Sequence, residues 1–107
     1  MKVFIYATEG IYQGLHGIEN HEVVEIENLK EAEWIGQEMA ESLIDEFGLE
    51  SDYYDEDGEV DFDPEFYYSI YAIADEYKSM TVDELNQILN REGHETFIEE
   101  YCGEELI

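Results

Sequence analysis

Carboxylates are the reactive side chains that this sequence concentrates most heavily. In the run ESDYYDEDGEVDFDPE, from Glu50 to Glu65, nine of sixteen residues are acidic and none is basic. Between Lys30 and Lys78 there is no Lys or Arg, whereas seventeen Asp and Glu fall in that interval. Closely spaced carboxylates can transfer protons, bind cations or imitate the phosphates of a nucleic acid. The residues around these acids decide among the three.

Proton transfer and metal binding receive little support from the surrounding residues. No sequence motif near the acids indicates a nucleophile facing them or a cleft around them. We therefore expect that the protein is not an enzyme and needs no cofactor. With Gly58 in the turn position of an EF-hand, the loop would run from Tyr53 to Pro64, and both anchoring ligands would be wrong. Loose binding of divalent cations remains an alternative. The remaining candidate ligands are too scattered to predict a zinc site, and they are His16, His21, His94 and Cys102.

The element that must position many of these acids is a helix over about residues 29–47. Asn28 is a candidate N-cap, and Glu31, three residues later, can form the reciprocal hydrogen bond of a capping box. Gly48 is a candidate for the residue that ends the helix. With successive residues about 100° apart, apolar residues collect on one arc and acids on the opposite arc. Trp34 falls on the acidic arc, where a large aromatic is a rim contact or a binding anchor. The acidic arc holds Glu31, Glu38, Glu41, Asp45 and Glu46, and the apolar arc holds Leu29, Ala32, Gly36, Met39, Ala40, Leu43 and Phe47.

An ordinary amphipathic helix also carries a polar outer face, and this alternative stays open for the helix alone. Two details weaken it. No Lys or Arg is interleaved beyond Lys30, although pairs of opposite charge three or four residues apart would have been favourable. The aromatic ring of Trp34 also lies among the acids.

The remaining elements predict an α+β fold. Residues 66–74 are ambiguous between helix and strand, and we favour a strand because it gives the first two strands a third partner. The expected fold is a small three-stranded, mostly antiparallel sheet packed by the long helix and two shorter C-terminal helices. The expected strands are 2–8, 22–27 and 66–74, the expected short helices are about 81–92 and 95–102, and 9–21 and 103–107 are expected to be a loop and a frayed end.

The composition is that of one folded domain, residues 1–107, with an extreme charge. The 44 % hydrophobic content suffices to fill a core. Thirty acids and four bases give a net charge of −26, far beyond the magnitude of roughly 2–8 that solubility requires. The uneven spread of the acids disfavours adaptation to high salt as its cause. Four bases cannot neutralise phosphates, so direct binding to nucleic acid or to an anionic membrane is not expected. The apolar run after Lys2 is too short for a signal peptide or a membrane span, which predicts a soluble intracellular protein.

These acid rows, with their aromatic neighbours and the near absence of Lys and Arg, are similar to those of a known class. The chain resembles the small acidic DNA-mimic proteins of phages and mobile elements, which include antirestriction and anti-CRISPR inhibitors. The resemblance implies a mechanism without a reaction, in which carboxylates at phosphate-like spacing occupy a basic channel. It implies as partner a nuclease or a restriction or CRISPR effector, and as location the cytoplasm of a bacterial host cell.

The candidate partner-binding residues therefore lie on the long helix and in the acidic segment 49–65. Two alternatives remain: an acidic adaptor that binds a basic protein without imitating DNA, and a weak divalent-cation binder. A second copy of the chain is a further candidate partner, since dimerisation would extend the charged surface. The candidate residues are Glu31, Trp34, Glu38, Glu41 and Asp45 on the helix, and Asp52, Tyr53, Tyr54, Asp55, Glu56, Asp57, Glu59, Asp61 and Asp63 in the segment.

Overall fold

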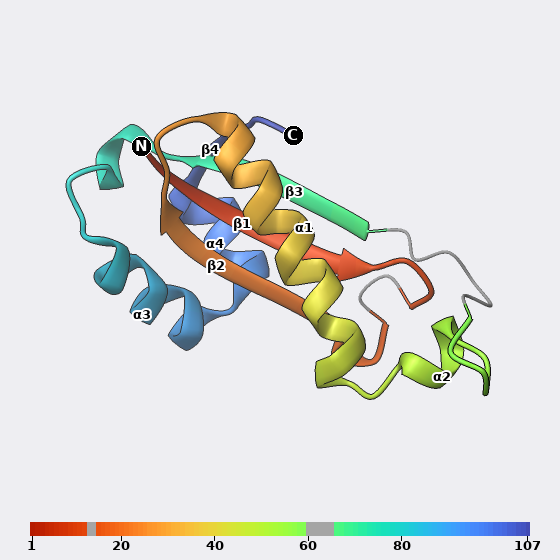
Figure 1. Ribbon diagram of the computed structural model, residues 1–107. Coiled ribbons are helices and arrows are strands. Elements are labelled where there is room, and N and C mark those ends of the chain that lie inside the picture. Colours follow the sequence, from red (N-terminus) through yellow and green to blue (C-terminus); the bar gives the residue numbers. More distant parts are fainter. Residues whose placement is uncertain (13–14, 60–65) are drawn as a thin grey trace.

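The chain forms an α+β fold in which an antiparallel sheet lies between two layers of helices (Figure 1). The computed structural model describes residues 1–12, 15–59 and 66–107. Within them, no helix is long and apolar enough to cross a lipid bilayer. The elements in chain order are β1 (Lys2–Glu9), β2 (Glu19–Glu25), α1 (Leu29–Glu46), α2 (Glu50–Tyr53), β3 (Phe66–Ile73), α3 (Val82–Glu92), α4 (His94–Tyr101) and β4 (Cys102–Glu105), with single 3₁₀ turns at Leu15–Gly17 and Asp75–Tyr77.

The sheet has four strands in the order β2-β1-β3-β4, and every neighbouring pair is antiparallel. The prediction of three strands was therefore wrong, although the α+β class and the choice of a strand for residues 66–74 are confirmed. The missing strand is β4, which comes from the segment expected to fray. The edge of β3 offers backbone groups that need partners, and the chain end supplies them: Leu106 donates its N–H to Ile70 at 2.7 Å, and Ile70 donates to Ile107 at 2.9 Å.

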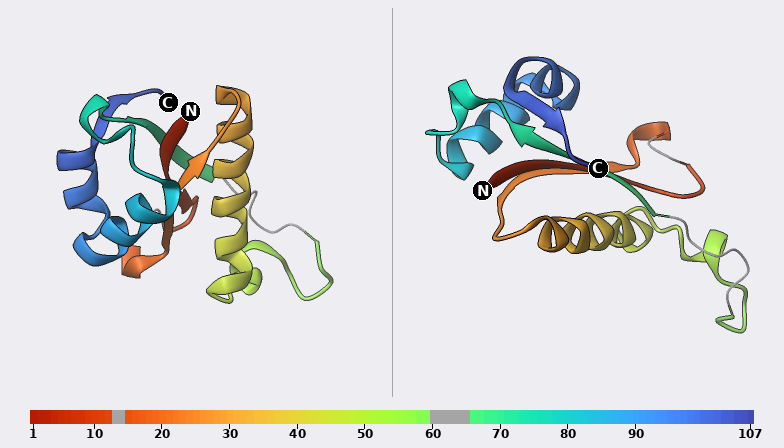
Figure 2. Two further views of the ribbon diagram at one scale, coloured as in Figure 1. Left: turned by 90° about the vertical axis from the view of Figure 1, so that its left-hand side faces the viewer. Right: turned by 90° about the horizontal axis from the view of Figure 1, so that it is seen from above.

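Helices cover both faces of the sheet, because β1 is apolar on both sides. Val3, Ile5 and Ala7 pack with α1 residues in one buried cluster, whereas Phe4 packs with residues of α3 and α4 in another. Figure 2 shows α1 on one side of the sheet and the α3–α4 pair on the other. The expected fold packed the sheet with these helices without dividing them between its faces, and the structure places α1 on one face and the C-terminal pair on the other. Alternation of side chains along a strand sends successive residues to opposite faces, and here both sets are apolar.

Helix α1 begins and ends where its sequence predicts. The Asn28 side chain accepts the Glu31 N–H at 3.0 Å, and Gly48 follows the helix with a φ of +66°, a conformation that favours glycine. The buried face holds small residues as well as large ones, and Gly36 lies against the ring of Tyr68 on β3. This contact lets α1 lie close to the sheet.

We expect Gly36→Ala to lower the free energy of unfolding by about 1–3 kcal/mol. A Cβ at this position would lie 2.9 Å from Cγ of Tyr68, closer than carbon atoms can pack. In an exposed helix position the same change would instead stabilise by up to about 1 kcal/mol, because alanine is the better helix former. Urea denaturation distinguishes the two signs, and in a Tyr68→Ala background the change Gly36→Ala should cost less than it does in the natural chain.

Helix α3 is fixed by a capping box and in turn protects an edge of the sheet. The Thr81 side chain accepts the Glu84 N–H at 3.1 Å, while the Glu84 carboxylate accepts the Thr81 N–H at 3.2 Å. From the middle of this helix, Asn86 reaches β2. Its amide oxygen accepts the Val23 N–H and its amide nitrogen donates to the Val23 carbonyl, both at 2.9 Å. One side chain thus makes the two bonds that a neighbouring strand would make.

A buried acid joins the end of β1 to the short helix α2. Glu9 is completely buried, and its carboxylate accepts the N–H groups of Ile11 and Tyr12 at 2.7 and 2.6 Å. The hydroxyl of Tyr53, the last residue of α2, also donates to Glu9. Tyr53 packs in a third apolar cluster with Leu43 of α1. The start of the acidic segment is therefore attached to the body of the fold.

Candidate partner-binding surface

The outer side of α1 presents one row of exposed side chains, which we call the acidic face of α1: Trp34, Glu38, Glu41 and Asp45. Their spacing of four, three and four residues places them in line along the helix. Trp34 is 61 % exposed, as an anchor for a partner would be. The three acids are exposed and border a shallow depression of about 520 Å³. The depression is lined by Ile35, Glu38, Met39, Glu41, Ser42 and Asp45.

Glu31, predicted to belong to this row, has a structural contact instead. Its carboxylate accepts the Glu27 N–H at 3.0 Å, just before the first turn of α1. Glu27 precedes the N-cap Asn28, so this bond draws the Glu31 side chain toward the start of the helix. Glu31 therefore extends the charge of the acidic face but is not free to turn toward a partner.

A second acidic surface follows α2, and hydrogen bonds from its backbone N–H groups to the Asp55 side chain hold its shape. Asp55 accepts the N–H groups of Asp57 and Glu59 at 3.0 and 2.9 Å, and Gly58 occupies the turn with a φ of +82°. This acidic turn, residues 55–59, leaves the side chains of Glu56, Asp57 and Glu59 in solvent. Figure 2 places α2 and the acidic turn on the same side of the sheet as α1.

The two tyrosines of the acidic segment differ in exposure. Tyr54 is 37 % exposed and borders a depression together with Glu50, Ser51, Asp55 and Glu56. Tyr53 is fully buried, so its predicted role as a contact for a partner does not fit its position. A buried tyrosine hydroxyl needs a hydrogen-bond partner, and Glu9 provides it; burial and this bond raise the pKa of Tyr53 to about 12. Asp52 accepts a hydrogen bond of 3.3 Å from the Tyr12 hydroxyl, and Asp61 and Asp63 lie outside the described residues.

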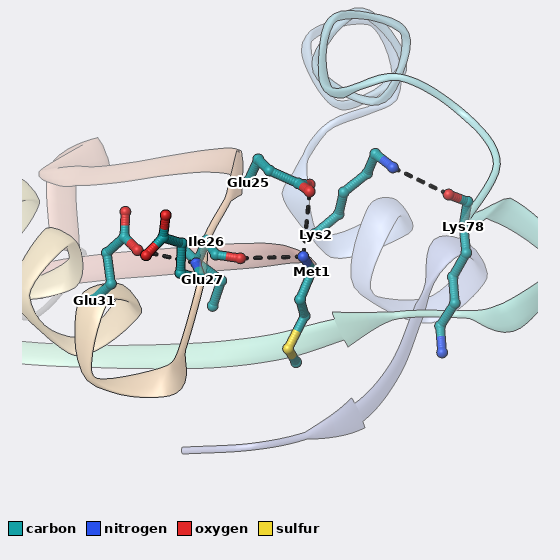
Figure 3. Close-up of polar contacts among 7 residues, drawn as sticks. All are labelled: Met1, Lys2, Glu25, Ile26, Glu27, Glu31 and Lys78. Carbon is teal, nitrogen blue, oxygen red and sulfur yellow. Dashed lines mark hydrogen bonds and ion pairs between the residues drawn. The ribbon is translucent and has the colours of Figure 1, made fainter.

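The positive groups gather away from the acidic turn. The Met1 ammonium group contacts the Glu25 carboxylate and the Ile26 carbonyl at 3.2 and 3.1 Å, and Lys2 donates to the Lys78 carbonyl at 3.2 Å (Figure 3). These residues meet where β1 begins and β2 ends. Lys30 lies in the first turn of α1, near the same end, and Arg91 lies on α3, across the sheet from α1. From residue 31 to residue 59 the chain has twelve acids and no base.

The sequence did not predict a group of three ligand-type side chains on the other face of the sheet. Glu19 and His21 of β2 meet His94 of α4, and each is half-buried. His21 was expected in a loop; it lies in β2. Burial and the neighbouring His94 lower the pKa of His21. The usable signal was the i, i+2 spacing of Glu19 and His21, which places both on one face of a strand. Nothing in the sequence indicated that residue 94 would lie beside them.

Fold and surface together define an α+β protein with a sheet between helix layers and one strongly acidic helix face. No protein-family model matches the chain, and neither a curated protein nor a solved structure does. Its function therefore has to be inferred from the side chains themselves.

Proposed function

We propose that this protein is an inhibitor that imitates DNA and occupies the basic nucleic-acid channel of a nuclease or another DNA-binding protein. The observation that carries the proposal is the acidic face of α1, where three exposed carboxylates and an exposed tryptophan stand in one row without a neutralising base. The acidic turn extends the charge on the same side of the sheet. Restriction and CRISPR effectors of a bacterial host are the kind of target that this surface fits.

The density of charge along α1 is close to that of one DNA strand. Glu31 and Glu46 bound a stretch of about 22 Å at 1.5 Å per residue. Six acids in that stretch give roughly one charge per 4 Å, compared with about 3.4 Å per phosphate along a strand of B-DNA. A channel that binds DNA by releasing counterions would release the same counterions to this helix. The six acids are Glu31, Glu33, Glu38, Glu41, Asp45 and Glu46.

The apolar residues add what charge alone does not provide. Long-range attraction between an acidic and a basic surface speeds association but contributes less to the lifetime of the complex. Large aromatic side chains are the ones that most often dominate binding energy once they are desolvated. Trp34 in the row and Tyr54 beside the acidic turn are placed to act as such anchors. Inhibition follows from occupying the channel, so no bond is made or broken and no cofactor takes part.

Affinity capture tests the proposal. The tagged protein is incubated with bacterial lysate, with and without excess nuclease-resistant duplex DNA. We expect recovery of a DNA-handling enzyme that the duplex displaces, and inhibition of that enzyme's activity by the purified protein. Recovery of a basic protein that DNA does not displace would overturn imitation of DNA and favour the adaptor alternative.

A matched pair of charge variants locates the surface. Glu38→Gln/Glu41→Gln/Asp45→Asn should weaken binding to the captured enzyme by roughly threefold to 150-fold, since each exposed charge contact contributes about 0.2–1 kcal/mol. The slope of log K against log salt should fall by up to about 3. The control Glu99→Gln/Glu100→Gln/Glu104→Gln changes net charge equally with exposed acids of α4 and β4, and should bind almost as tightly as the natural protein. Equal loss in both variants would show that total charge, rather than the acidic face of α1, determines binding.

The first of these variants should not unfold. Like charges three or four residues apart on a helix repel by about 0.2–0.5 kcal/mol per pair, and removing them leaves the midpoint of thermal unfolding unchanged or raises it. A clear fall in the midpoint would mean that these acids are structural, which would contradict their assignment to a partner.

A further inference from the structure

One strand, β2, and one helix, α4, bring a glutamate and two histidines together on the sheet face opposite α1. Glu19 and His21 are alternate residues of β2 and point to the same face as Val23, which packs with Phe97 of α4. His94 is the first residue of α4. The fold therefore joins residues that are more than seventy positions apart in the chain. We call Glu19, His21 and His94 the His–Glu cluster.

The distances in the His–Glu cluster suit a single metal ion. One ligand atom from each residue lies within 4.8 Å of the other two. His94 Nδ1 is 3.4 Å from Glu19 Oε1, and the two imidazole centroids are 5.2 Å apart. Ligand bonds of about 2.0–2.1 Å in a tetrahedral zinc site place ligand atoms about 3.3 Å from one another. The Glu19–His94 pair already has this separation, and one ligand atom of His21 lies within 4.8 Å of both.

One polar atom of the cluster is buried without a partner. His21 Nδ1 has no hydrogen bond among the described residues, although it is shielded from solvent. A buried nitrogen left unsatisfied is unfavourable and uncommon in folded proteins. Nδ1 of an imidazole is a ligand atom for zinc and related metals, and a metal ion at the cluster would satisfy it.

Tyr6 of β1 holds the cluster from the sheet side. Its hydroxyl donates to Glu19 Oε2 at 2.6 Å, and its ring stacks on His94 with centroids 5.0 Å apart. It is also the cross-strand partner of His21. A hydrogen-bonded partner behind a ligating carboxylate orients that ligand and strengthens metal binding. Glu19 thus keeps Oε1 toward His94 while Oε2 is occupied by Tyr6.

We infer that Glu19, His21 and His94 form a binding site for one divalent metal ion of the zinc class, with Glu19 Oε1, His21 Nδ1 and a ring nitrogen of His94 as ligands. Two imidazoles and one carboxylate favour Zn²⁺, Co²⁺ or Ni²⁺ over Mg²⁺ and Ca²⁺, which prefer oxygen ligands. Three protein ligands leave a fourth position for water. The ion would connect the edge strand β2 to α4. The site does not depend on the proposed binding of a partner, because it lies on the other face of the sheet.

The test uses the full chain after treatment with a chelator. Zn²⁺ is added in the presence of excess Mg²⁺, which saturates weak sites on the acidic surface, and thermal unfolding is followed by circular dichroism. With free zinc at about one hundred times the dissociation constant, the midpoint should rise by roughly 10 °C. Titration with Co²⁺ should give one equivalent bound and the intense visible absorption of a tetrahedral ion with nitrogen ligands.

Variants separate the site from general attraction to acids. Glu19→Gln, His21→Asn and His94→Gln should each weaken Zn²⁺ binding by at least about tenfold. Glu22→Gln is the matched control, since it removes one exposed carboxylate from the same strand on the opposite face; it should bind as the natural protein does. Equal binding by all four variants, or a cobalt spectrum of octahedral oxygen ligation, would overturn the inference. The cobalt spectrum of the natural protein decides the matter even if a histidine variant fails to fold.

Discussion

Replacing Glu9 with alanine should lower the free energy of unfolding by about 3 kcal/mol. The change removes the acceptor of three donors, namely the Ile11 and Tyr12 N–H groups and the Tyr53 hydroxyl. A buried donor that loses its acceptor costs about 1–3 kcal/mol. The variant also loses one negative charge from a chain of −26, which reduces self-repulsion and acts in the opposite direction. The measured loss is therefore a lower limit for the contribution of these bonds.

Urea denaturation at fixed salt measures this loss, and hydrogen exchange shows where it acts. Glu9→Gln is the matched control, because the amide keeps one acceptor oxygen and the side-chain shape; we expect a smaller loss than with alanine. Amide protons of α2 should exchange faster in Glu9→Ala, since the Tyr53 hydroxyl loses its hydrogen bond to the end of β1 and keeps the one it accepts from the Ile11 N–H. A loss below about 1 kcal/mol would mean that water or other groups replace the carboxylate easily.

Phe97→Ala should lower the free energy of unfolding by about 3–5 kcal/mol, the range for a large side chain removed from a core. The ring projects from α4 onto the sheet and is fully buried, with centroid distances of 5.1 Å to Phe4 and 5.3 Å to Tyr101. Its removal leaves a cavity between the sheet and the C-terminal helices. Phe97→Leu refills most of the volume and should cost clearly less.

Trp34→Ala is the informative comparison for Phe97→Ala. Both changes remove a large aromatic ring from a helix, but Trp34 is 61 % exposed whereas Phe97 is not exposed at all. We expect Trp34→Ala to change stability by no more than about 0.5 kcal/mol while weakening binding to the captured enzyme. A core-sized loss of stability in Trp34→Ala would remove Trp34 from the acidic face as a candidate anchor.

The parts of the fold that were predictable from sequence are those fixed by local signals. Helix α1 has a cap, a stop and an apolar period over 18 residues, and β1 has alternating β-formers. Strand β3 was predicted correctly from its aromatic and β-branched residues, although the spacing of its apolar residues suited a helix as well. Helix α1 and strand β1 are long enough for their own side chains to determine the structure, whereas the choice of a strand for β3 also used the partner it offers to the first two strands.

The parts that were missed depend on contacts between distant segments. Strand β4 has the sequence CGEE, which carries no strand signal, and it pairs because the edge of β3 needs partners. The four residues of α2 show no helical period. Tyr53 was predicted as an anchor for a partner, but it is buried and its hydroxyl donates to Glu9, which lies more than forty positions away in the chain. The face of α1 was predictable because a helix fixes it locally; the His–Glu cluster was not, because it exists only after α4 packs on β2.

The bonds that Asn86 makes to Val23 also bear on how copies of the chain behave when crowded. A sheet grows into fibres when the outer strand of one molecule pairs with the outer strand of the next. On β2 the amide of Asn86 already occupies a donor and an acceptor that an incoming strand would require. On the opposite side, β4 is only four residues long and carries Glu104 and Glu105. Both edge strands of the sheet thus resist edge-to-edge pairing between molecules. The protein can therefore reach a high concentration without assembling through its sheet.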